Sequence, residues 1–163
     1  MSTKTIQAQV ARPVMLFAAM FLIGACKSSN PEPATTEMSA LPAELSAAGP
    51  ILNEVNTEVP GISQRQNILA TGSLLGLAKT RMPADQFAEV ARAIPGAEAL
   101  IVEAARQGVP RSALTNLTSV TEYLGKQGVT QDQVTQRIIP VLDKAVKGKV
   151  TPGVEANFNA AIR

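Results

Sequence analysis

The sequence predicts an all-α protein, a small bundle of about five to seven short amphipathic helices that follows a signal peptide and a flexible linker. Three observations support this fold class. Apolar residues recur at helical spacing in several segments after residue 51, and each segment is bounded by capping residues, Gly or Pro. No segment alternates apolar and polar residues with the β-branched enrichment of strands. The first 26 residues, finally, have the pattern of a basic, apolar and then small-residue export signal.

The N-terminal segment, residues 1–25, is predicted to be a cleaved signal peptide. Lys4 and Arg12 precede Val14–Ile23, an unbroken run of ten apolar residues. A spanning helix needs about 20 apolar residues, so this run is too short to be a permanent anchor. The alternatives are an ordinary cleavage site or an uncleaved anchor, in either of which Cys26 has no special role.

Ile23, Gly24, Ala25 and Cys26 resemble the lipobox of bacterial lipoproteins. The resemblance implies cleavage before Cys26 and covalent attachment of a diacylglycerol and an acyl chain to that residue, with membrane lipid as the partner of the anchor. Several chains hold a protein stably on a membrane. Lys27 follows the Cys, where Asp would imply retention in the inner membrane. For a Gram-negative host the resemblance thus implies a lipid-anchored protein of the outer membrane that faces the periplasm.

Residues 26–50 are predicted to be the lipidated Cys and a flexible linker. The segment is rich in Ser, Thr, Ala and Glu, and Pro31, Pro33, Pro42 and Pro50 interrupt any helix. Such a tether spans about 25 to 30 Å as a coil and about 75 Å when straight. The helical domain is expected over residues 51–163.

The first long helix is expected over Ser63–Thr80. Ser63 and Gln66 have the spacing of a capping box, and the apolar residues that follow lie on more than one face. This helix is therefore predicted to be the core helix. Gly72 and Gly76 lie four residues apart on one face and favour close approach of a second helix within the domain, although in lipid the same spacing would indicate dimerisation.

The remaining segments follow the same rules in shorter helices. They are predicted over 83–94, 97–107 and 114–124, and from Thr130 and Thr151 onward. Pro140 lies inside the segment that starts at Thr130, and we expect it to kink or split that helix. Gly61–Gln66 and Gly128–Gln133 share one residue pattern, which indicates either a duplicated helical hairpin or independent convergence on good capping.

Several blocks of the later sequence resemble the VcgC/VcgE-type bacterial domain of unknown function. The blocks are Leu74–Lys79, Phe87, Val90–Gly96, Leu124-Gly125 and Ile138–Leu142, and the resemblance extends over about residues 51–163. It implies a small helical domain of bacterial proteins. It implies no activity, ligand or catalytic residue.

The residue inventory argues against an enzyme and against a metal or other cofactor beyond the lipid. There is no His and only one Cys, so the commonest general base, the commonest zinc ligand and any disulfide are missing. The candidate nucleophiles have no His to activate them, and none begins a Ser-x-x-Lys motif; they are Ser63, Ser73, Ser112 and Ser119. We therefore predict no catalytic residue.

Charge and aromatic content argue against nucleic acid as a partner. Without residues 1–25 the chain has as many basic as acidic side chains, and it retains only three aromatic residues. One basic cluster is a candidate for contact with anionic headgroups, although it also fits a helix C-terminus whose cations complement the helix dipole. It consists of Arg137, Lys144, Lys147 and Lys149.

These observations predict a membrane-anchored envelope lipoprotein with a non-enzymatic role in protein interaction or structure. Its partner would be an unknown envelope protein or polymer. The alternative is a periplasmic carrier of a small apolar ligand, because the domain has many Ala, Gly and aliphatic residues and few large aromatics to fill a core.

Overall fold

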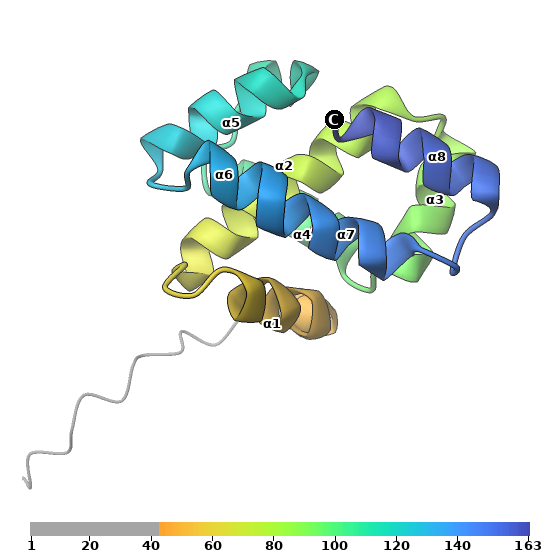
Figure 1. Cartoon of the computed structure of the whole chain (residues 1–163), viewed down its shortest axis with the longest axis horizontal. Helices are drawn as coiled ribbons and strands as arrows, with labels where there is room; N and C mark the ends of the chain where they lie inside the picture. Colours follow the sequence, from red (N-terminus) through yellow and green to blue (C-terminus); the bar gives the residue numbers. More distant parts are fainter. Residues whose placement is uncertain (1–42) are drawn as a thin grey trace, which may run out of the picture. The chain divides into compact units, whose positions relative to one another are not determined.

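The central element of the fold is helix α2 (Gln64–Arg81), as the computed structural model of the protein shows (Figure 1). The structure describes residues 43–163. The Ser63 hydroxyl accepts a hydrogen bond from the Gln66 backbone N–H, and the Gln66 side chain accepts one from the Ser63 N–H at 2.9 Å. This capping box starts the helix where the sequence predicted. All residues from 67 to 78 are buried, which confirms α2 as the core helix.

All regular elements in the described residues are helical, and none is a strand, so the predicted all-α fold is confirmed. The helical segments from α6 to α7 form one continuous run, residues 131–146, and counting that run once gives seven α-helices in this part of the chain. Besides α2 the elements are η1 (Ala43–Ala48), α1 (Gly49–Glu58), α3 (Ala84–Ala93), α4 (Ala97–Arg106), η2 (Arg111–Thr115), α5 (Leu117–Lys126), α6 (Gln131–Gln133), η3 (Val134–Ile138), α7 (Ile139–Val146) and α8 (Pro152–Ala161).

The other helices pack around α2. Helix α4 makes the most extensive contact with it, and α5 and η2 contact it as well. Helix α1 packs against α7, and α3 against α8 (Figure 1). Because α2 is surrounded in this way, its apolar side chains on several faces are all covered, which is what the sequence pattern required.

Residues 43–50, the last part of the predicted linker, are helical and packed against the domain. Leu45 and Ala48 of η1 are buried, and a Cβ added at Gly96 would lie 2.6 Å from the Ala48 nitrogen. Pro50 does not interrupt this region, because it lies in the first turn of α1, where a missing N–H costs no hydrogen bond. The folded domain thus includes η1 and α1, and begins earlier than the predicted boundary at residue 51.

A buried polar network fixes α1 on α2. The Asn67 side-chain amide donates to the Leu52 carbonyl and to the Asn56 side chain, both at 2.8 Å, and the Thr71 hydroxyl donates to the Asn67 Oδ1. Hydrogen bonding compensates the cost of burying these polar groups. The network sets the position of α1 more specifically than apolar contact alone.

The predicted helix over 114–124 is two elements. Asn116 is extended, with φ −157° and ψ 167°, and its side chain accepts a hydrogen bond from the Ser119 N–H at 2.8 Å. Asn116 therefore caps α5, and Leu114 lies before the break on η2. The apolar periodicity from Leu114 to Leu124 predicted one helix, but Asn116 caps a new helix within that segment and so divides it in two.

The interruption expected at Pro140 is present as a change in hydrogen bonding rather than a gap. One turn of π-helix, η3, precedes α7, and the Ile139 N–H donates to the Val134 carbonyl. Pro140 lies in the first turn of α7, so its missing N–H is accommodated there.

The two similar capping segments adopt the same local structure. Gly61 and Gly128 have φ of 82° and 83°, and each is followed by a complete capping box. The Gln66 side-chain amide also donates to the Gln127 carbonyl at 2.9 Å, so the segments are in contact. A positive φ disfavours residues other than Gly, and this explains the Gly in both copies under either duplication or convergence.

Candidate binding groove

An apolar groove of about 490 Å³ lies between α2, α4 and the segment that ends in η2. We call it the α2–α4 groove. It opens to solvent, and most of the residues that line it are apolar. Its lining residues are Gly72, Ser73, Gly76, Lys79, Thr80, Ile101, Val102, Ala104, Ala105, Val109, Arg111 and Leu114.

The glycines of α2 form the base of this groove by permitting close helix contact. A Cβ at Gly72 would lie 2.4 Å from the Leu100 carbonyl oxygen and 2.7 Å from the Ala104 Cβ. A Cβ at Gly76 would lie 3.0 Å from a methyl carbon of Leu114. The predicted close approach within the domain is therefore confirmed for α4 at Gly72, while Gly76 admits the side chain of Leu114.

Ser73 provides the one polar group in the buried part of the groove. It is 1% exposed, and its hydroxyl has no hydrogen-bond partner among the described residues. Three other buried polar atoms in residues 43–163 lack partners, but none of their residues lines this groove. Its hydroxyl oxygen is also closed off from solvent, so this unpaired group lies beneath the surface of the groove.

The rim of the groove combines exposed apolar surface with positive charge. Val102 is 63% exposed, the one large hydrophobic side chain so exposed in the described part of the chain. Lys79 forms an ion pair with Glu98 and lies 5.7 Å from the centre of the Phe87 ring. Arg111 is exposed and has no ion-pair or hydrogen-bond partner among residues 43–163. Its charge is therefore available at the rim.

The apolar walls and the exposed guanidinium of Arg111 at the rim suit recognition of an amphipathic surface.

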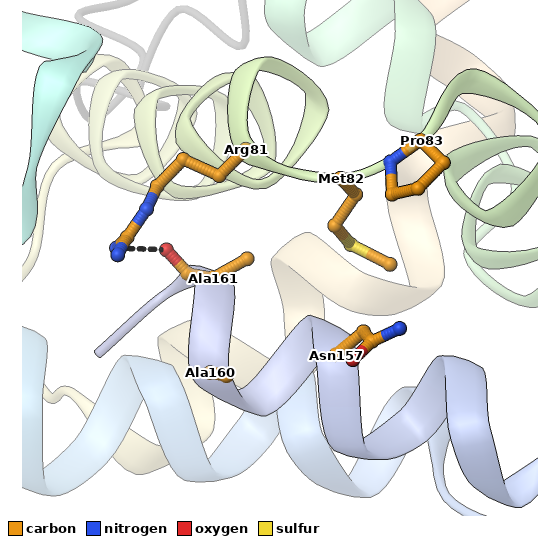
Figure 2. Close-up of a pocket in the computed structure, with 6 residues that line it drawn as sticks. All are labelled: Arg81, Met82, Pro83, Asn157, Ala160 and Ala161. Carbon is orange, nitrogen blue, oxygen red and sulfur yellow. Dashed lines mark hydrogen bonds between the residues drawn. The ribbon is translucent and has the colours of Figure 1, made fainter.

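A smaller cavity of about 270 Å³ lies where α2 and α8 end (Figure 2). Arg81 donates from Nη1 to the carbonyl oxygen of Ala161 at 2.8 Å. A cation at the C-terminus of α8 complements the partial negative charge there. The guanidinium thus has a structural role, and Met82, Pro83, Asn157 and Ala160 complete the lining.

The predicted basic cluster is partly engaged within the domain. Lys144 forms an ion pair with Glu54 of α1 at 2.7 Å, and that hydrogen bond raises the pKa of Lys144. Arg137 donates to the Glu58 carbonyl at 2.8 Å. The side chains of Lys147 and Lys149 are exposed and have no hydrogen-bond or ion-pair partner among residues 43–163. The structure thus joins two of the four cations to the acidic helix α1.

The residues predicted for lipidation and cleavage, Ile23, Gly24, Ala25 and Cys26, lie outside the described residues. Within residues 43–163, no helix is long and apolar enough to cross a membrane, and no group of three potential ligands could hold a metal ion.

Sequence reasoning identified Gly72 and Gly76 but not the groove that they line. The groove needs α4, whose side chains Ile101 and Val102 could not be assigned to a shared surface from periodicity alone. It also needs the break at Asn116, which places Leu114 and Arg111 on a separate element. The exposure of Val102 follows from packing and has no local sequence signal.

Comparison with known protein families gives a match over most of the chain. The profile of the protein of unknown function VcgC/VcgE (DUF2780) matches residues 18–137. The match starts before the expected position 51, contains every residue that lines the α2–α4 groove, and ends before α7 and α8. No curated protein and no solved structure shows significant similarity. The match extends over most of the sequence, and the chain belongs to the VcgC/VcgE family of proteins of unknown function.

Proposed function

We propose that this protein is a lipid-anchored lipoprotein of the bacterial envelope and that its helical domain is a non-enzymatic protein-interaction module. The α2–α4 groove carries the proposal. It joins an apolar lining to an exposed Val102 and to the exposed, unpaired guanidinium of Arg111.

The lining residues of the groove all fall between positions 72 and 114, inside the region 18–137 that the family profile matches. The anchor rests on the lipobox resemblance at Cys26 and the residues before it. A lipid anchor and a tether would keep such a groove near the membrane, where envelope proteins or polymers are available to it.

The second candidate function is a carrier of a small apolar ligand. The volume of the groove, about 490 Å³, lies in the range of small-molecule sites. Against it, carrier sites enclose most of their ligand, whereas this groove opens to solvent beside Val102, which is 63% exposed. Protein interaction is therefore the better supported function.

Crosslinking in cells tests the proposal. The full chain, with a C-terminal affinity tag, would be treated in living cells with a cell-permeable crosslinker and purified from the membrane fraction. We expect one reproducible envelope protein to be joined to it. Recovery of the protein alone, at several crosslinker lengths, would refute the interaction function and favour the carrier.

A further inference from the structure

We infer that the domain is an internal duplication, in which two copies of one three-helix unit interlock and each copy is the packing partner of the other. The first unit consists of α1, α2 and α3. The second unit consists of α5, the continuous run from α6 to α7, and α8. The inference concerns how the domain is built and goes beyond the proposed interaction function, on which it does not rest.

The helices of the two units follow one another at the same spacing. Counterpart helices start 68, 67 and 68 residues apart, and the pairs of first residues are Gly49 and Leu117, Gln64 and Gln131, and Ala84 and Pro152. In both units the first and the third helix have ten residues. Convergence on good capping would explain the shared capping box before each second helix, but it would not fix the lengths and the spacing of the other helices.

The third helices also share the register of their buried side chains. The buried pairs, each 68 residues apart, are Val90 and Phe158, Ala93 and Ala161, and Ile94 and Ile162. The same hydrogen bond ends both helices. The Ile94 N–H donates to the Val90 carbonyl at 2.9 Å, and the Ile162 N–H donates to the Phe158 carbonyl at 3.1 Å. The two helices therefore turn equivalent positions toward the core.

The contacts between the two units are reciprocal (Figure 1). The first helix of each unit packs against the second helix of the other, α1 against η3 and α7, and α5 against α2. The third helix of each unit likewise contacts the second helix of the other, and α3 and α8 pack against each other. Two identical subunits meet in this reciprocal way across an isologous interface. In the described part of the chain, the principal contacts without a counterpart involve η1, α4 or η2, which lie outside both units.

Hydrogen bonds at the ends of the first helices are reciprocal as well. The side-chain amide of Gln66, in α2, donates to the carbonyl of Gln127, directly after α5, at 2.9 Å. Arg137, in the second unit, donates to the carbonyl of Glu58, the last residue of α1, at 2.8 Å. In both cases the second helix of one unit satisfies a carbonyl at the C-terminus of the other unit's first helix, where carbonyls have no partner within the helix.

Two small cavities occupy counterpart positions between the units. In the cavity of about 270 Å³, Arg81 donates to the Ala161 carbonyl (Figure 2). A cavity of about 210 Å³ is lined in part by Lys149 and Ala93. Arg81 and Lys149 each lie three residues before the third helix of their own unit, and Ala161 and Ala93 each end the third helix of the other. Lys149 is therefore the counterpart of Arg81, a cation beside the C-terminus of a third helix.

Reciprocal exchange of these two cations tests the correspondence in the full chain. Lys149→Arg places a guanidinium beside the C-terminus of α3, where it should donate to the Ala93 carbonyl as Arg81 does to the Ala161 carbonyl. We expect the melting temperature of Lys149→Arg to rise by about 2–4 °C, and that of Arg81→Lys to fall by about as much.

Two further exchanges at exposed positions are the controls. Lys147 and Arg65 line neither cavity, and their side chains have no hydrogen-bond or ion-pair partner among residues 43–163. Lys147→Arg and Arg65→Lys should leave the melting temperature within about 1 °C of the wild type. Shifts at positions 81 and 149 no larger than those of the controls would overturn the correspondence. So would a crystal structure of Lys149→Arg in which the guanidinium does not reach a carbonyl at the end of α3.

Cleavage between the units tests whether they interlock. A protease recognition sequence inserted after Gly108, an exposed residue between α4 and η2, allows the folded full chain to be cut into one fragment for each unit. The uncut protein with the same insertion is the control. We expect the fragments to remain a one-to-one complex in size-exclusion chromatography, with an unchanged helical circular dichroism spectrum and a melting temperature that falls on dilution. Separation of the fragments without denaturant would overturn the interlocked arrangement. Neither experiment needs an external partner, so both outcomes are independent of the interaction function.

Discussion

At the scale of single residues, Ser73 and Glu103 show two opposite solutions for a buried polar side chain. The Ser73 hydroxyl has lost its water without gaining a hydrogen bond, at a cost of about 1–3 kcal/mol. Glu103, on the neighbouring helix α4, accepts hydrogen bonds from Arg106 at 2.7 Å and from Gln107 at 2.8 Å. The Ser73 hydroxyl is thus left unpaired, whereas both carboxylate oxygens of Glu103 accept hydrogen bonds.

The satisfied carboxylate predicts a pH dependence of stability. The pKa of Glu103 lies below its ordinary value of 4.5, chiefly because of the hydrogen bond from Arg106, and then because of Gln107. A group with a lowered pKa in the folded state stabilises the fold fully above its ordinary pKa and loses that effect as pH falls through the folded value. Glu103→Gln should therefore unfold at a lower denaturant concentration than the wild type at pH 7.

The same comparison at acid pH provides the check. The difference between wild type and Glu103→Gln should shrink steadily below about pH 4.5, and it should be small throughout because Arg106 is 69% exposed. Glu122→Gln, at an exposed position of α5, is the control and should show no such difference. A Glu103→Gln deficit that is constant from pH 7 to pH 3 would contradict the assignment of the stabilisation to the charged carboxylate.

At the scale of elements, local rules predicted helix starts well and domain edges poorly. Ser63 and Thr130 begin helices as expected, since a capping box depends on residues only three apart, and Thr151 precedes α8, which begins at Pro152. The segment before residue 51 was predicted as linker because its Pro residues are helix breakers in general. Their effect depends on position in the helix, and Pro50 occupies a tolerated one, which local composition does not reveal.

Leu45→Ala tests whether η1 belongs to the folded domain. Leu45 is 2% exposed and part of the core cluster, so its truncation should lower the free energy of unfolding by about 2–5 kcal/mol. Denaturant unfolding of the purified protein measures the change. If the denaturant midpoint of Leu45→Ala equalled that of the wild type, residues 43–50 would not belong to the folded domain.

The close contact of α2 with α4 leads to a second prediction at this scale. Gly72→Ala places a Cβ 2.4 Å from the Leu100 carbonyl oxygen, and because that oxygen is backbone it cannot move without displacing α4. We expect a loss of about 1–3 kcal/mol or more in the free energy of unfolding. Gly125→Ala, where a Cβ would meet nothing within 4 Å, should be neutral or stabilising by up to about 1 kcal/mol. Equal melting temperatures for the two variants would contradict the close packing.

At the scale of the whole molecule, the fold class could be predicted and the binding site could not. Helical periodicity and capping are properties of neighbouring residues, so the all-α class follows from the sequence. The groove joins Gly76, Val102 and Arg111, which lie on three elements, and their meeting depends on the contact of α2 with α4 and on the chain reversal at residues 107–110. The ion pair between Lys144 and Glu54 likewise links helices near the two ends of the domain. No pattern of neighbouring residues in the sequence indicates it.

The anchor is the remaining whole-molecule prediction, and Cys26→Ala tests it. If Cys26 carries the diacylglycerol and acyl chain, the wild type should show a mass increase of an acylated N-terminus and be found in the membrane fraction. The Cys26→Ala variant should lack that mass increase and should retain residues 1–25. The wild type, in which residues 1–25 are removed, is the control. Lys27→Asp keeps the lipid but should shift the protein from outer-membrane to inner-membrane fractions. Normal processing of Cys26→Ala would refute the anchor. The groove would then have to meet its partner in solution, and its affinity for that partner could not draw on confinement at a membrane.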